Sequence, residues 1–346
     1  MSDSSGGNKA IFAALAANLG IAVTKFIAWM LTGMSSMLAE AIHSVADSGN
    51  QILLLVGGKR ARKDADEFHP FGYARERYVA GFVVSIVIFS VGGMFSLYEA
   101  YEKYHEMSLP DAPHPGTHEK WWWVPIVVLV ASILMEGRSL MTAVSEAKKE
   151  KGDQSWGSFL RNAKSPELPV LLCEDSAAVA GLTFALFGVS LAVFTENGIW
   201  DAVGAGLIGL LLIAVAAFLF RETRSLLLGE AARPETVREI RSAVESADGI
   251  ERVIHLKTSH LGPNELMVAA KIAIDPQARG AEIVRSIDAA QQAARRVDPD
   301  LQMLVYLEPD VDTGGDASGG IGHVTSAQRE NAPGEWHVGP SRPDDR

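Results

Sequence analysis

The sequence predicts an α-helical membrane protein with six spans, followed by a smaller soluble α+β domain. Long apolar stretches fill the first two thirds of the 346 residues. The last third alternates charged and apolar residues, as a soluble domain does. This uneven distribution is why the mean hydropathy of the whole chain is only slightly positive.

Six stretches reach or approach the roughly 20 apolar residues that a helix needs to cross a bilayer. They lie near residues 10–32, 36–57, 78–101, 121–145, 169–194 and 199–221. The second and fifth look least apolar, because the second carries His43 and Asp47 and the fifth carries Glu174 and Asp175. Ionisable groups are costly in a bilayer, so these side chains must face a protein interior or a water-filled cavity.

Short loops on one side of the predicted membrane carry most of the basic residues. Lys59 and Arg60 follow the second span, Lys148 and Lys149 follow the fourth, and Arg221 closes the sixth. The positive-inside rule therefore places both termini in the cytoplasm. We expect a multi-pass protein of a bacterial inner membrane, although an organelle membrane would require the same spans.

The last third has the pattern of a small open sheet with helices on one side. Pro234 in a helix-start signal predicts a first helix. The expected order is a helix near 234–246, strands at 250–259 and 265–274, a helix near 280–297 and a strand at 301–307.

Four parts follow from these patterns. They are an N-terminal cytoplasmic segment (1–9), a transmembrane domain (10–225), a cytoplasmic domain (226–310) and a tail (311–346). The tail is expected to be disordered, because it is rich in Gly, Asp, Ser and Pro and has almost no apolar periodicity.

Composition excludes several classes of protein. The formal net charge of −11 offers no basic face for nucleic acid. The single cysteine, Cys173, excludes an intramolecular disulfide. We find no nucleophile motif, phosphate loop or cofactor fingerprint, so we do not expect an enzyme.

The strongest chemical signal is the pair His43 and Asp47 in the second span. Residues four apart project from one face of a helix, and Asn50 continues that face. Imidazole nitrogen and carboxylate oxygen are ligands that zinc-like ions prefer. The pattern indicates a metal or proton site, and the alternative is a polar contact between membrane helices.

The fifth span places Glu174 and Asp175 side by side. Neighbours on a helix point about 100° apart, so only one of them is expected to face the same site. The alternative is that both cap a helix that begins later. In the fourth span Glu136 and Arg138 either pair with neighbouring helices or line a water cavity, and Lys25 in the first span either snorkels or pairs with a carboxylate.

Two motifs resemble the cation diffusion facilitator family of divalent-metal/proton antiporters. The first is Ser35-Ser-Met-Leu-Ala-Glu-Ala-Ile-His-Ser-Val-Ala-Asp47, and the second is Phe68-His-Pro-Phe-Gly-Tyr-Ala-Arg-Glu-Arg77. The segments that begin at Glu136 and Glu174 are most similar to the zinc transporter nine-like branch. The resemblance runs from about residue 10 to about residue 310.

The resemblance implies six transmembrane helices, cytoplasmic termini, a ferredoxin-like C-terminal domain and a homodimer in the lipid bilayer. It also implies a metal site shared by the second and fifth helices. His43 and Asp47 match the pair on the second helix. Metal ligands must lose protons to bind, so the implied mechanism is alternating access that exchanges metal for protons.

The fifth helix departs from the family pattern of His-x-x-x-Asp. The best alignment puts Asp175 on the aspartate and Leu171 on the histidine. If Glu174 takes the histidine position instead, Ala178 falls on the aspartate. Either way the site becomes richer in oxygen, which would admit Mn²⁺ or Fe²⁺, while Zn²⁺ remains the first expectation.

Two cytoplasmic metal sites of the family are also altered. Asp66 and His69 fit a site in the loop after the second span, but Tyr73 stands where a histidine is common. In the last domain His255 fits a ligand position, whereas Lys271, Tyr306 and Glu308 replace other ligands. These changes support a rival function, in which the protein is a transport-inactive dimeric membrane scaffold or regulator.

Overall fold

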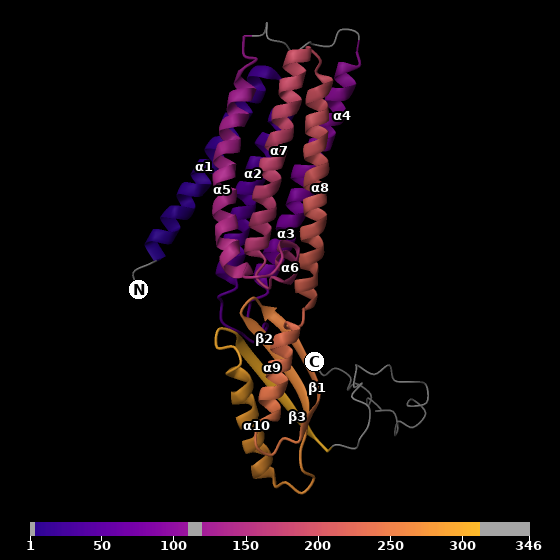
Figure 1. Ribbon diagram of the computed structural model, residues 1–346. Helices are drawn as coiled ribbons and strands as arrows, with labels where there is room; N and C mark the ends of the chain where they lie inside the picture. Colours follow the sequence, from indigo (N-terminus) through magenta and orange to yellow (C-terminus); the bar gives the residue numbers. More distant parts are fainter. Residues whose placement is uncertain (1–3, 110–119, 312–346) are drawn as a thin grey trace, which may run out of the picture. The chain divides into compact units, whose positions relative to one another are not determined.

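The computed structural model describes residues 4–109 and 120–311 (Figure 1). The chain forms two units, the first made mainly of the helices before residue 238 and the second mainly of the residues after it. The predicted disordered tail lies outside the described residues, except for Val311.

Long helices occupy the positions of all six predicted spans. In chain order they are α1 (Ser4–Thr32), α2 (Ser35–Arg60), the continuous stretch of α3 (Glu76–Val87), η1 (Ile88–Met94) and α4 (Phe95–Met107), then α5 (Val124–Lys151), α7 (Glu167–Thr195) and α8 (Ile199–Leu228). The short helix α6 (Trp156–Asn162) lies between α5 and α7 and was not predicted.

Among the described residues, four helical stretches are long and apolar enough to cross a membrane. These are Glu76–Met107, Val124–Lys149, α7 and α8. The described apolar part of α1, Asn18–Thr32, is shorter, and α2 is not in this set. The expectation that the fifth span is weakly apolar was wrong, since α7 keeps a long apolar window despite Glu174 and Asp175.

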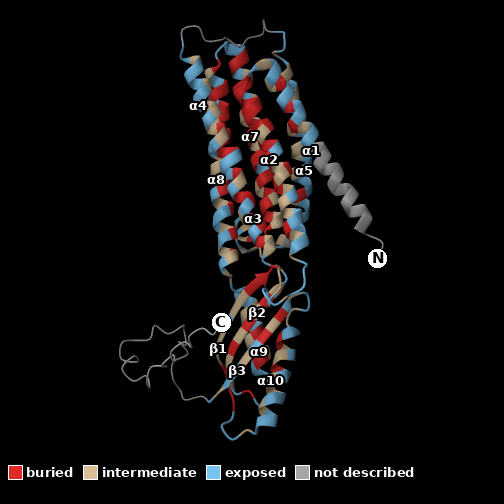
Figure 2. Cartoon of the chain, turned by 180° about the vertical axis from the view of Figure 1, so that it is seen from behind, coloured by how far each residue is buried: buried red, intermediate tan, exposed pale blue. Residues whose placement is uncertain are grey.

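The interior of the bundle is built from the facing sides of α2, α7 and α8, where buried residues form continuous stripes (Figure 2). Met37, Leu182, Ile208 and Leu212 belong to its apolar core. Because α2 and α7 are central in this packing, polar side chains on their inner faces are removed from the lipid.

The N-terminal end of α2 is fixed by a residue of α8. The Asp201 carboxylate accepts hydrogen bonds from the backbone N–H groups of Ser35, at 2.6 Å, and Ser36, at 3.2 Å. The first N–H groups of a helix lack partners within the helix, so Asp201 caps α2 from a distant part of the chain. This contact holds α2 in position along α8.

A π-helical segment, η1, interrupts the helix that runs from α3 to α4. A Cβ added to Gly93 would lie 2.7 Å from Cγ1 of Ile213, so η1 approaches α8 closely. The Ser96 hydroxyl donates to the carbonyl oxygen of Gly92 at 2.7 Å. A Cβ on Gly92 would lie 3.9 Å from His43 Nδ1. The wide turn, of a kind common at functional sites, thus lies beside the predicted ligand.

The part of the chain after α8, which contains most of the second unit, follows the predicted order of helices and strands. It comprises α9 (Pro234–Glu245), β1 (Arg252–Gly262), β2 (Glu265–Ala273), α10 (Gly280–Arg295) and β3 (Gln302–Asp310). The sheet order is β1-β2-β3. Backbone hydrogen bonds join Asn264 to Gln302 and Ile274 to Asp310, so β3 runs parallel to β2 and α10 makes the crossover.

The helices of this unit are tied to the sheet by side chains. Arg241 of α9 donates to the carbonyl oxygen of Val253 at 2.8 Å, and Gln291 of α10 donates to that of Val305 at 3.1 Å. Alternate residues of β2 are buried, as expected for a strand with one covered face.

Candidate metal site

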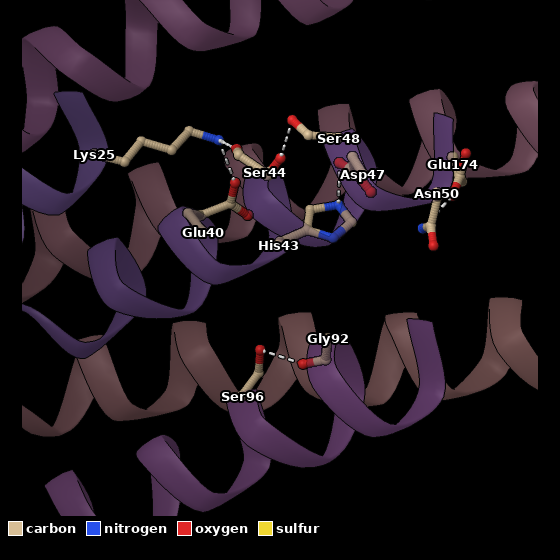
Figure 3. Close-up of polar contacts among 10 residues, drawn as sticks. All are labelled: Lys25, Glu40, His43, Ser44, Asp47, Ser48, Asn50, Gly92, Ser96 and Glu174. Carbon is tan, nitrogen blue, oxygen red and sulfur yellow. Dashed lines mark hydrogen bonds and ion pairs between the residues drawn. The ribbon is translucent and has the colours of Figure 1, made fainter. Parts of the chain in front are cut away.

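The predicted pair on α2 is formed in the structure. His43 is only 3% exposed, and its Nε2 lies 3.5 Å from Oδ2 of Asp47 (Figure 3). Both residues lie on the inner face of α2, because the spacing of four residues returns the second side chain to the same side of the helix. The two ligand types therefore meet one turn apart inside the bundle.

Several atoms of this group have no hydrogen-bond partner among the described residues. They are Nδ1 and Nε2 of His43, Oδ1 of Asp47 and Oδ1 of Asn50, all buried and without a hydrogen bond. Buried polar atoms in proteins are normally hydrogen-bonded, and exceptions concentrate where a ligand binds or chemistry occurs. An imidazole nitrogen and a carboxylate oxygen with free lone pairs are the kinds of atom that can bind a metal ion.

Asp47 opens onto a small polar cavity between α1, α2, α5 and α7. Its volume is about 30 Å³, enough for one ion or a water molecule. The lining residues are Asn18, Ser44, Asp47, Gln51, Glu136, Ser139, Leu171, Glu174 and Asp175. Four of them are carboxylates, so the cavity is strongly acidic.

Both acidic residues of α7 reach this cavity. Oε1 of Glu174 accepts a hydrogen bond from Nδ2 of Asn50 at 2.7 Å, and Oδ2 of Asp175 accepts one from the Ser139 hydroxyl at 2.9 Å. The expectation that only one of the two faces the site was therefore wrong. The cavity lies where α7 meets both α2 and α5, so side chains about 100° apart can both line it.

Two further cavity residues bear on the sequence predictions. Glu136 of α5 lines the cavity, which was one of the two predictions made for it, whereas Arg138 is exposed. Leu171, one turn before Asp175, lines it as well. The position aligned with the missing histidine thus reaches the cavity with an apolar side chain.

The described residues surround the cavity without drawing their ligands to one point. In that part of the chain no three His, Cys, Asp or Glu side chains already lie at metal-binding geometry. His43 contacts Asp47 but is not among the lining residues. Rotation of the side chains about their χ angles would be needed to close a ligand shell around an ion.

The predicted loop site is held together by a lysine. Oδ2 of Asp66 accepts hydrogen bonds from Nζ of Lys63 and from the hydroxyl of Tyr73, each at 2.7 Å. Nδ1 of His69 lies 3.5 Å from Oδ1 of the same carboxylate. The Lys63 ammonium and the Tyr73 hydroxyl hold the pKa of Asp66 well below its usual range. The ammonium of Lys63 thus already neutralises the carboxylate that was predicted to bind a metal.

In the last domain, Lys271, which aligns with a ligand position of the family, pairs with two carboxylates. Nζ of Lys271 lies 2.8 Å from Oδ2 of Asp310 and 3.4 Å from Oε1 of Glu308. His255 lies half-buried on β1, and no ligand cluster forms around it among the described residues. The structure therefore gives no support to metal binding by His255.

Sequence reasoning missed the neutral residues of the cavity. Asn18, Gln51 and Ser139 carry no charge and were not predicted as site residues. Helical spacing was the available signal, since Gln51 lies one turn after Asp47 and Ser139 lies three residues after Glu136.

The length and apolarity of the helices identify an integral, multi-pass membrane protein. Inside its bundle a buried histidine–carboxylate pair lies beside an acidic cavity. Residues 11–228 match the model of the cation efflux transmembrane domain. Residues 232–310 match that of the cytoplasmic domain of cation efflux proteins. The chain belongs to the cation efflux, or cation diffusion facilitator, family.

Individual relatives differ in the metals that their names state. The chain is 31% identical over 273 residues to the human mitochondrial proton-coupled zinc antiporter SLC30A9. The aligned region covers 78% of this chain and 46% of that protein. It is 28% identical over 271 residues to metal tolerance protein C4 of Arabidopsis thaliana, covering 78% and 57%. It is 21% identical over 310 residues to the manganese efflux system protein MneP of Bacillus subtilis, covering 87% and 95%. The chain spans about half the length of the first two relatives.

Proposed function

We propose that this protein exports a divalent metal ion, Zn²⁺ in the first place, in exchange for protons. The observation that carries the proposal is the buried pair His43 and Asp47 beside a cavity of ion size. Nitrogen and carboxylate ligands suit Zn²⁺, and the SLC30A9 relatives are named as zinc antiporters. The oxygen-rich surroundings and the MneP relative make Mn²⁺ and Fe²⁺ the alternative substrates.

The proposed ligand set is His43 and Asp47 from α2 with Asp175 or Glu174 from α7. Each ligand must be deprotonated to hold the metal, so loading of metal releases protons and loading of protons releases metal. Imidazole and buried carboxylates can both accept protons at cellular pH, which allows the same groups to bind each cargo in turn. Alternating access of this site to the two sides then produces antiport.

The proposal extends to the assembly. We place α1 and α2 across the membrane together with the four more apolar stretches, giving six spans with both termini in the cytoplasm. The order of α9 to β3 is the basis for proposing a ferredoxin-like domain that joins two copies of the chain. We propose a bacterial inner membrane, and note that the SLC30A9 relatives are named as mitochondrial.

The test is zinc flux into proteoliposomes under an imposed pH gradient. His43→Ala should lower the flux roughly tenfold or more, because it removes a direct ligand. His105→Ala, at an exposed histidine of α4, is the matched control and should keep native flux. If the native chain moves neither zinc, manganese nor iron, transport is refuted and the dimeric scaffold becomes the better description.

A further inference from the structure

Lys25 is a buried charge that does not belong to the proposed ligand set. It lies on α1 and is 1% exposed. A charged residue at membrane depth is costly, and such residues usually pair with an opposite charge or serve an ion pathway. The contacts of Lys25 suggest that it does both.

The ammonium group of Lys25 contacts two residues of α2. Nζ donates to Oε2 of Glu40 at 3.0 Å and to the hydroxyl of Ser44 at 2.8 Å (Figure 3). The other oxygen of Glu40, Oε1, lies against Gly181 of α7 and has no hydrogen-bond partner among the described residues. A buried ion pair that served stability alone would be expected to satisfy both carboxylate oxygens.

Ser44 connects this pair to the acidic cavity. It accepts the hydrogen bond from Lys25 and also lines the cavity together with Asp47. Glu40, Ser44 and Asp47 are spaced four and three residues apart, so they share one face of α2. A single hydroxyl group therefore stands between the ammonium of Lys25 and the cavity.

The cavity has an excess of negative charge. Its described lining contains the carboxyl groups of Asp47, Glu136, Glu174 and Asp175 and no lysine or arginine. Lys25 is the cation bonded to its wall. A lysine ammonium on a flexible stem is a point charge, which is suited to act on a neighbouring ion site through its field.

We propose that the fixed positive charge of Lys25 opposes binding of the transported metal in this acidic cavity. Its positive charge weakens binding of a divalent ion, which allows the ion to leave quickly, and Glu40 offsets part of that charge. Lys25 is thus a positioning residue that sets affinity without coordinating the metal. The inference rests on the proposed transport function.

The two members of the pair should shift the KM for zinc in opposite directions. Lys25→Gln removes the repelling charge, so KM should fall by roughly tenfold and the maximal flux should fall with it as release slows. Glu40→Gln leaves the lysine charge uncompensated, so KM should rise by a similar factor. The double variant should return toward the native KM, and Lys25→Arg, which keeps the charge, should stay near it.

A purely structural pair would behave differently. Both single variants would then lose folded protein and maximal flux together, with KM unchanged. Zinc binding to the purified variants, measured by calorimetry on monodisperse protein, gives a second reading that does not require transport. If Lys25→Gln does not fold, an unchanged KM in Glu40→Gln still overturns the inference. Absence of flux in the native chain would refute the transport function instead, whereas native flux with unshifted KM in the variants refutes only the role of Lys25.

Discussion

Asn50 shows how a neutral side chain can direct a buried carboxylate. Its Nδ2 donates to Oε1 of Glu174 at 2.7 Å, which links α2 to α7 beside the cavity. A hydrogen bond of this kind fixes the orientation of the group that accepts it. The side chain of Glu174 is buried and lines the acidic cavity.

We predict that Asn50→Ala raises the KM for zinc about tenfold, because Glu174 loses the donor that orients it. The measurement is zinc flux as a function of zinc concentration in proteoliposomes. Asn197→Ala, at an exposed position after α7, provides the control. A native KM in Asn50→Ala would mean that Glu174 takes no part in binding.

His260 gives a pH-dependent contribution outside the membrane spans. It lies 4% exposed near the end of β1, and burial lowers the pKa of its imidazole below the ordinary value of 6.5. The unfolded chain therefore binds a proton more readily than the folded chain. The contribution of neutral His260 to the free energy of unfolding is fully present above about pH 6.5 and is lost as the pH falls below that value.

We predict that the melting temperature of the purified protein falls between about pH 7 and about pH 5, and that His260→Gln reduces this fall. Circular dichroism across the pH series measures both curves. Equal slopes in the native chain and the variant would show that His260 does not contribute. Other titrating groups remain the same in both proteins, so their effects cancel in the comparison.

The contact between α7 and α8 depends on glycine. A Cβ added to Gly188 would lie 2.8 Å from the carbonyl oxygen of Trp200 and 3.1 Å from Cα of Gly204. Small residues allow membrane helices to approach closely, and backbone atoms cannot move aside as a side chain can. The packing of these two central helices therefore has no room for a methyl group at this point.

We predict that Gly188→Ala destabilises the bundle by about 1–3 kcal/mol, as overpacking of a tight contact does. Gly137→Ala on α5 is the matched control, since a Cβ there meets nothing within 4 Å. Thermal unfolding in detergent compares the two variants. Equal melting temperatures would show that α7 and α8 are less tightly packed than the structure indicates.

The elements of the fold were largely predictable, and the exceptions have physical causes. Apolar length predicted the long helices, and period-two alternation predicted the strands of the second unit. Helix α6 was missed because seven residues, capped by Ser155, give too short a pattern. The π turn was missed because side-chain periodicity does not show which carbonyl each N–H bonds.

The contact between His43 and Asp47 was predictable from the sequence, whereas the longer-range contacts around it were not. His43 and Asp47 are four residues apart, so local helix geometry is enough to bring them together. The contact of Asp201 with Ser35 and the contact of Asn50 with Glu174 join residues far apart in sequence. Such contacts depend on how the helices pack, which the sequence pattern alone does not specify.

The orientation of the whole molecule can be tested with the single cysteine removed. Cys173→Ala gives a cysteine-free chain. Asn197 follows α7 and Asp248 lies in the second unit, and both are exposed. We predict that an impermeant maleimide labels Asn197→Cys in intact cells and labels Asp248→Cys only after lysis, as cytoplasmic termini require. The reverse pattern would invert the topology and the direction of transport.

The π turn in η1 has a consequence for the mechanics of the third span. A π turn contains one residue more than an α-helical turn, so it changes the register of the helix locally. The part that follows is rotated by about 100° relative to an unbroken α-helix. If the position of the π turn shifted along the chain, the residues that it passed would rotate about the helix axis, while α3 would keep its orientation. The π turn lies beside His43, so such a shift would change which residues of this helix face the proposed ion site while the helix stays continuous.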